Sequence, residues 1–287
     1  MRTQIELNMP APGFWRATFA NPPINLVDPE TISELSELIV RLERDPDIKV
    51  IVFESGDPDF FLAHYDVLVD KARTAAMIPG PTGMHPWLDV LVRLSRAPVV
   101  SISSIRGRAR GAGSEFALAC DIRFASAEKA VLGQFEVGVG AVPGGNPMIR
   151  LANLMGRGRA LEVVLGADDF PGALAERYGY VNRAVPDAEL DGFVDRFARR
   201  IAGFDKDALR EAKRFVDEAS LPDDSLFPPA LDQFFVSVMR PATKARMAEL
   251  LEAGLQKRSD LELNLGQRIA TGRVGEIPDE TFSGGDA

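Results

Sequence analysis

Apolar residues in the first half of the chain follow two alternating patterns, one typical of strands and the other of helices. After Asp28, which can cap a helix, apolar positions recur with helical spacing until residues 45–47 end the pattern. Continuous β-branched runs are typical of strands buried on both faces. The pattern predicts strands at residues 4–9, 14–20, 50–53, 98–105 and 122–125, and helices after Asp28, at 87–94 and at 114–120. This alternation predicts an α/β fold.

The pattern changes after residue 187, where strand-like runs give way to helical spacing. Segments 187–203, 205–219, 227–239 and 243–270 are each predicted to be helical. We therefore predict a boundary near residue 203. Residues 1–203 would form an α/β core that carries the ligand site, and residues 204–287 would form a helical region.

The composition excludes several classes of protein. The chain has 287 residues, of which 46% are hydrophobic and 26% charged, as in ordinary globular proteins. Its formal net charge of −9 argues against a nucleic-acid binder, which needs a basic surface. The N-terminus has no apolar segment of signal-peptide length, and no run of about 18 apolar residues occurs. We therefore expect a cytoplasmic protein with no membrane partner. A single cysteine, Cys120, excludes an intrachain disulfide.

A turn of small residues at 107–113 follows a predicted strand and leads into an apolar helix. The unpaired N–H groups at the start of such a helix can stabilise an oxygen that gains negative charge. Glu115 would lie in the first helical turn, close to anything bound there. Small residues equally suit tight packing between strand and helix, and this interpretation stays open.

Two further segments carry candidate chemistry. Glu136 precedes a glycine-rich stretch, although a lone carboxylate before a turn is more often solvated than catalytic. His64 lies in a turn after the strand at 50–53 and could act as an acid or a base. Because the chain has only two histidines, a Ser-His-Asp hydrolase or a His-rich metal site is poorly supported.

Taken together and in order, these segments resemble the enoyl-CoA hydratase (crotonase) family. Residues 61–66 resemble that family's F-x-A-G-x-D turn, and residues 107–115 with 120–123 resemble its G-x-A-x-G-G-G-x-E…CDI segment. Residues 133–144 resemble its G-Q-P-E…G-x-x-P-G segment. The likeness spans roughly residues 14–200, and the ordered co-occurrence of the motifs is more specific than any one of them.

The resemblance implies a spiral of repeated ββα units, with a C-terminal helical region, here 204–287, that builds homotrimers or dimers of trimers. It implies an oxyanion hole made by two backbone N–H groups, which fall on Tyr65 and Ala112. It also implies two catalytic glutamates, and Glu115 and Glu136 fill both positions. The expected ligand is an acyl-CoA substrate, with coenzyme A as part of that substrate. We expect no permanently bound cofactor and no metal.

The resemblance further implies roles for side chains around the two glutamates. Gln134 and the backbone at Gly144 would shape a water site beside them. Residues expected to contact the acyl group are Ala63, His64, Met84 and Trp87. We expect Glu115 to hold and deprotonate water and Glu136 to deliver a proton to the α-carbon of a 2-enoyl thioester.

The chain departs from the family pattern at several positions. His64 replaces the usual glycine, Tyr65 a small residue, Ala112 a glycine and Phe135 a proline. These departures leave other reactions on the same scaffold open, namely enoyl-CoA isomerisation, C–C hydrolysis or decarboxylation, and thioester hydrolysis. A non-catalytic acyl-CoA-binding oligomer is a further alternative. Paired glutamates argue against it, because a binder has no need to bury two carboxylates.

Overall fold

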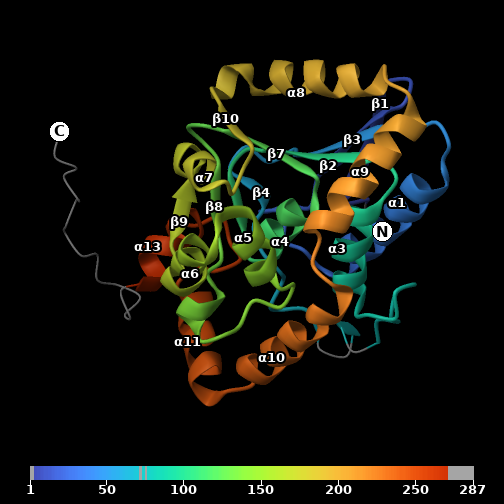
Figure 1. The fold of residues 1–287 in the computed structure, drawn as a ribbon. Coiled ribbons are helices and arrows are strands. Elements are labelled where there is room, and N and C mark those ends of the chain that lie inside the picture. Colours follow the sequence, from blue (N-terminus) through green and yellow to red (C-terminus); the bar gives the residue numbers. More distant parts are fainter. Residues whose placement is uncertain (1–2, 71–72, 75, 271–287) are drawn as a thin grey trace.

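A six-stranded sheet forms the centre of the computed structural model, which describes residues 3–70, 73–74 and 76–270 (Figure 1). Its strands lie in the order β1-β2-β3-β5-β7-β10, and all neighbours are parallel except the antiparallel pair β1 and β2. The strands are β1 (Ile5–Ala11), β2 (Phe14–Phe19), β3 (Val50–Ser55), β5 (Val100–Ile105), β7 (Ile122–Ser126) and β10 (Arg183–Val185). The first five confirm the predicted strands to within a few residues.

A second, four-stranded sheet in the order β4-β6-β8-β9 turns the chain into a spiral. It is formed by β4 (Phe60–Leu62), β6 (Arg108–Arg110), β8 (Val131–Gly133) and β9 (Asp169–Pro171). Three times, a strand of the large sheet is followed by a strand of the small sheet and then by a helix: α3 (Pro86–Arg96), α4 (Ala112–Ala119) or α5 (Pro147–Met155). This repetition confirms the predicted ββα spiral. The small strands have three residues each, too few for an alternating pattern to be recognised.

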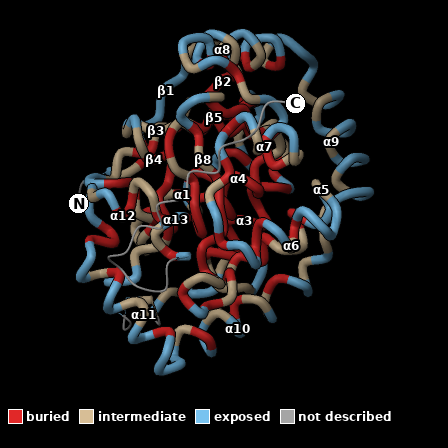
Figure 2. The backbone as a smooth tube through the Cα atoms, turned by 90° about the vertical axis from the view of Figure 1, so that its left-hand side faces the viewer, coloured by how far each residue is buried: buried red, intermediate tan, exposed pale blue. Residues whose placement is uncertain are grey.

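The main hydrophobic core lies where the two sheets and helices α1 (Pro29–Arg44), α3 and α4 meet. Asp28 caps α1 as predicted, because its carboxylate accepts from the Thr31 amide at 2.8 Å. Every residue of α4 is buried, which explains why its sequence is apolar or small apart from Ser114 and Glu115. In Figure 2 the buried backbone fills the interior around α3 and α4, while α8 and α9 are largely exposed.

Two helices extend along the outside of the large sheet. Helix α8 (Asp187–Ala202) covers the face opposite α4, where Leu190, Val194 and Ala198 pack on the strands (Figure 1). Helix α9 (Lys206–Ser220) is held mainly by Lys213, whose ammonium group donates to the Ala97 and Val99 carbonyls at 2.8 and 3.0 Å and contacts Asp121 at 2.8 Å. Both helices were predicted from their spacing.

The chain from α9 onward wraps around the other side of the core. This C-terminal part contains α10 (Pro228–Val238) and α11 (Pro241–Glu252). Two earlier helices, α6 (Arg157–Gly166) and α7 (Gly172–Tyr178), lie between α5 and α8 in the chain. The prediction of one helix over 243–270 is wrong. Gly254 adopts a φ of +111°, and Ser259 caps a new short helix, α12 (Asp260–Leu263), which is followed by α13 (Leu265–Ala270). The boundary near residue 203 stays a prediction.

Candidate active site

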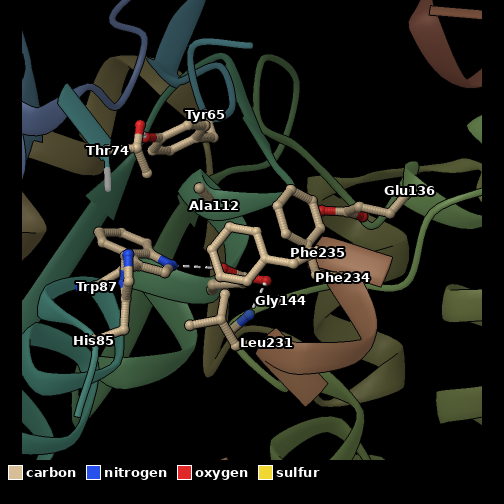
Figure 3. A pocket seen from close by; sticks show the side chains of 12 residues that line it. Tyr65, Thr74, His85, Trp87, Ala112, Glu136, Gly144, Leu231, Phe234 and Phe235 are labelled. Carbon is tan, nitrogen blue, oxygen red and sulfur yellow. Dashed lines mark hydrogen bonds between the residues drawn. The ribbon is translucent and has the colours of Figure 1, made fainter. Parts of the chain in front are cut away.

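A pocket with a cavity volume of about 70 Å³ lies between α4, the segment before α3, and α10 (Figure 3). Its walls are largely apolar and aromatic, with two carboxylates among them. The lining residues are Tyr65, Thr74, His85, Trp87, Ala112, Glu115, Glu136, Gly144, Gly145, Leu231, Phe234 and Phe235. The pocket therefore brings together both predicted catalytic glutamates, both residues predicted to supply oxyanion-hole amides, Gly144 and Trp87.

Small residues at the start of α4 allow this arrangement. A Cβ atom on Gly113 would lie 1.9 Å from the Leu62 carbonyl oxygen, so only glycine lets α4 approach β4 this closely. Gly111 has a φ of +47°, and a Cβ there would lie 2.7 Å from Oε1 of Glu136. The close packing agrees with the structural interpretation of the small-residue turn, and the approach of a ligand to its N–H groups stays a prediction. The turn packs the helix tightly and leaves room for a carboxylate.

Glu115 lies in the first turn of α4 and is only 3% exposed. Its Oε2 accepts from the Trp87 indole N–H at 2.7 Å, and its Oε1 accepts from the Gly145 amide at 2.8 Å; both bonds are drawn as dashed lines in Figure 3. Burial raises the pKa of Glu115 overall, although the hydrogen bonds from Trp87 and Gly145 lower it. Because both oxygens face groups that can only donate, the hydrogen bonding fits the ionised carboxylate.

Glu136 is the first residue of the short helix η1 (Glu136–Val139) and is 7% exposed. Within the described part of the chain, its buried Oε2 has no hydrogen-bond partner. Burial, followed by the charge of Glu115, raises the pKa of Glu136 to about 8. Glu136 therefore keeps its proton at neutral pH, whereas the two donors that face Glu115 favour its ionised form. Environments that separate two carboxylates in this way are typical of an acid and base pair.

Tyr65 and Ala112, the residues predicted to supply the two oxyanion-hole amides, both line the pocket. Tyr65 forms a parallel bridge with Val27, in which the Val27 amide donates to the His64 carbonyl and the Asp66 amide donates to the Val27 carbonyl, each at 2.8 Å. In a parallel bridge these bonds leave the Tyr65 amide pointing away from Val27. Ala112 is the first residue of α4, where amides have no acceptor within the helix. Among the described residues, neither amide forms a backbone hydrogen bond.

Four predicted site residues lie outside the pocket lining. Ala63 and Gln134 are buried next to it, at 1% and 0% exposure, in the small-sheet layer. Met84 packs on Leu88 and other residues of a neighbouring cluster. His64 is buried, its ring contacts Glu262, and it does not line the pocket. Trp87 does line the pocket, but its indole N–H is used to hold Glu115.

Several pocket residues were not predicted. Leu231, Phe234 and Phe235 come from α10, in the region taken from sequence to be separate from the ligand site. His85 caps α3, where its Nδ1 accepts from the Trp87 amide at 3.2 Å, and burial lowers its pKa. Gly145 lies beside the predicted Gly144. None of these belongs to a recognisable motif, and only the aromatic pair Phe234–Phe235 is unusual in an otherwise ordinary helix.

Neither a metal site nor a membrane segment is found in the described part of the chain. Its His, Cys, Asp and Glu side chains form no group of three or more that could hold a metal ion. Similarly, none of the helices between residues 3 and 270 combines the length and apolar character needed to cross a bilayer.

An α/β spiral with two buried carboxylates in one pocket is the arrangement that the family resemblance implies, and comparisons with known proteins identify the family. The enoyl-CoA hydratase/isomerase family model matches residues 13–226. This chain therefore belongs to the enoyl-CoA hydratase/isomerase family.

Individual relatives carry related names. The "Probable enoyl-CoA hydratase, mitochondrial" of Dictyostelium discoideum is 30% identical over 194 residues, which is 68% of each chain. The crotonyl-CoA hydratase of Syntrophomonas wolfei is 28% identical over 80% of this chain and 87% of its own. A crystal structure from Streptomyces avermitilis, described as a "putative enoyl-CoA hydratase", has a TM-score of 0.89 at 44% identity and covers 93% of this chain and 96% of its own.

Proposed function

We propose that this protein is a lyase that adds water across the double bond of a short 2-enoyl-CoA thioester. The observation that carries the proposal is the pair of buried carboxylates, Glu115 and Glu136, which line one pocket with different surroundings: two N–H groups donate to Glu115, whereas Oε2 of Glu136 has no partner among the described residues. Addition of water needs one group to accept a proton and another to donate one. The cavity of about 70 Å³ is smaller than the roughly 300 Å³ and above of typical drug-sized pockets, which favours a short acyl group.

The reaction follows from the positions of these groups. Ionised Glu115 takes a proton from water as the water oxygen bonds to C3 of the enoyl group. The π electrons move toward the thioester oxygen, and the amides of Tyr65 and Ala112 stabilise the resulting enolate. Glu136 then gives its proton to C2, which completes the 3-hydroxyacyl thioester. Each oxyanion donor would contribute a rate factor of about 10²–10³, and exchange of a proton with solvent restores both carboxylates.

The other features predicted from the family resemblance remain part of this proposal. Coenzyme A would be carried by the substrate, without a permanent cofactor. A homotrimer or a pair of trimers and a cytoplasmic location stay predictions.

The direct test offers the purified protein three kinds of thioester in parallel: crotonyl-CoA, a 3-enoyl-CoA and a saturated acyl-CoA. We expect crotonyl-CoA to give 3-hydroxybutyryl-CoA, followed by loss of the enoyl ultraviolet absorbance and by mass spectrometry. Conversion of only the 3-enoyl thioester would identify an isomerase, and release of free thiol would identify a hydrolase. Either result would overturn the proposed hydration.

Trp87→Phe should reduce the ionised fraction of Glu115 without emptying the pocket. This change removes the indole N–H that donates to Glu115, and a hydrogen bond to a charged group contributes about 1.5–3 kcal/mol. Because that bond lowers the pKa of Glu115, we expect the pKa to rise. The acidic limb of the pH profile of kcat/KM should therefore move to higher pH, with a loss of about ten-fold or more below neutrality. A limb that stays in place would show that Trp87 does not tune Glu115.

A further inference from the structure

The side chain of His64 turns away from the pocket into a buried contact with the C-terminal part of the chain. Its Nε2 lies 2.8 Å from Oε1 of Glu262 in α12, and its Nδ1 lies 2.9 Å from the Tyr65 carbonyl oxygen. The two side chains are 1% and 0% exposed. Glu262 lies beyond residues 13–226, the segment matched by the family model.

The partners of His64 require both of its ring nitrogens to donate. A carbonyl oxygen can only accept, and Oε1 of Glu262 also accepts from the Gln256 amide at 2.6 Å. This arrangement fits an imidazolium paired with a carboxylate. Burial lowers the pKa of His64, but the charge and hydrogen bond of Glu262 outweigh it, so the pKa is raised overall.

The charged groups around this pair come from strands β6 and β9 and from the turn that contains Asp66. Arg110 of β6 donates to the Glu262 backbone carbonyl at 2.7 Å and is itself neutralised by Asp169 of β9, with two bonds of 2.6 Å. Asp66 faces the pair through the side chain of Gln256, at 2.8 Å. Arg110 opposes the positive charge on His64, whereas Glu262 favours it.

His64 holds the peptide groups on both sides of the Tyr65 α-carbon. Its own carbonyl, which shares a peptide group with the Tyr65 amide, accepts from Val27 at 2.8 Å. Its ring donates to the Tyr65 carbonyl, which belongs to the next peptide group. With both peptide planes fixed, the Tyr65 amide has one orientation, directed away from Val27. The Asp66 amide, which belongs to the same second peptide group, donates to the Val27 carbonyl at 2.8 Å. Breaking the contact to Glu262 would free the ring and remove the other of the two bonds that hold this second plane.

We propose that His64 and Glu262 are positioning residues that hold the Tyr65 amide toward the thioester oxygen, so that the C-terminal helix α12 completes the oxyanion hole. This inference rests on the proposed function, because it assigns the Tyr65 amide to the thioester carbonyl. It gives a role to the histidine that replaces the family's usual glycine. Glu262 acts through His64 and touches no reacting atom.

Glu262→Gln tests the proposal, because it keeps the size of the side chain and removes its charge. We expect kcat for crotonyl-CoA to fall about 10- to 100-fold, as small misplacement of a reacting group does, with KM changed less than about two-fold. The infrared carbonyl band of bound, ¹³C-labelled butyryl-CoA, which undergoes no hydration, should move back toward its position in solution. His64→Gln should have the same effects, and the double variant should be no slower than the slower single variant.

Arg258→Gln is the matched control. Arg258 joins the same C-terminal segment to the core through Asp57 and Asp59 but does not touch His64. It should keep kcat and the carbonyl band. If the role of Glu262 were purely structural, Glu262→Gln and Arg258→Gln would lose thermal stability alike. Folded Glu262→Gln protein would then keep the wild-type carbonyl band of bound butyryl-CoA, and that result would overturn the proposal.

The wild-type protein supplies a further test that needs no variant. The chain has only His64 and His85, so ¹⁵N NMR of the two imidazoles is readily assigned. His64 should keep its second proton to a higher pH than His85, because the pKa of His64 is raised and that of His85 is lowered. The opposite order of titration would overturn the proposal. If no thioester is hydrated but bound butyryl-CoA still shows a polarised carbonyl that depends on Glu262, the proposed function fails while the positioning role stands.

Discussion

Glu136→Gln protein should hydrate crotonyl-CoA about 10²–10⁴ times more slowly than wild type, the usual range for a positioned acid or base. The amide has the size of the carboxyl group but cannot deliver a proton to C2. Wild-type kcat/KM should itself fall above a pH of about 8, where Glu136 loses its proton. Initial rates across a pH range of about 5–10 check both expectations.

The same substitution should stabilise the protein at alkaline pH. Glu136 has a pKa of about 8 in the folded chain and an ordinary value of 4.5 when unfolded. Below pH 4.5 both states are protonated. Between 4.5 and 8 only the unfolded state releases the proton, so stability is lost by up to about 1.4 kcal/mol for each pH unit. The substituted amide has no proton to release, and the advantage of the variant in thermal unfolding should grow from a pH of about 5 to about 9.

Glu176→Gln, on the exposed surface of α7, is the matched control and should change neither activity nor the pH dependence of stability. Full activity of Glu136→Gln would remove Glu136 from the mechanism. Loss of activity without the alkaline stabilisation would mean that Glu136 is ionised in the folded protein, and the assignment of acid and base would then have to be reversed.

Local sequence patterns were sufficient for much of the fold. The cap at Asp28, the buried strand at β3 and the turn into α4 each depend on residues close together in the chain, and the structure confirms them. The small sheet could not be predicted this way, because three-residue strands have no recognisable period. Likewise, the helix break at Gly254 depends on the positive φ of one residue. Glycine permits a positive φ but does not require it, so the break could not be predicted from the residue type.

The site shows the same division between local and distant contacts. The positions of Glu115 and Glu136 could be inferred from family motifs, but their protonation depends on contacts between distant segments. Trp87 is 28 residues from Glu115, and Glu262 is 198 residues from His64. Neither pair follows a spacing rule. The sequence predicted His64 to be a substrate contact. Its partner Glu262 could not be predicted, because Glu262 lies in the region that the sequence assigned to oligomerisation.

The contrast between the two carboxylates explains how one apolar pocket can support both halves of a hydration. Two N–H donors favour the charge on Glu115, whereas Oε2 of Glu136 has none among the described residues, so burial acts on them unequally. Gly145 is essential to this difference. A Cβ there would lie 2.3 Å from Oε2 of Glu115, so only glycine allows the backbone amide to reach the carboxylate.

Glu115→Gln should lose activity by a similar factor of about 10²–10⁴ and, unlike Glu136→Gln, should also lower stability. The glutamine side chain has a single acceptor oxygen, whereas Trp87 and Gly145 both donate to Glu115. One of these buried donors would face an amide NH₂ group, and an unsatisfied buried donor costs about 1–3 kcal/mol. Thermal unfolding at neutral pH would measure this loss.

Removing the charge of Glu115 should also lower the pKa of Glu136 below about 8, because that charge is one of the two causes of its elevation. Carboxyl ¹³C NMR of Glu136 in Glu115→Gln protein measures the change directly. If the two glutamates act in one step, the double variant should be about as slow as the slower single variant, because residues that act as a unit are not additive. Fully multiplicative losses, with an unchanged pKa of Glu136, would show that the two carboxylates act independently.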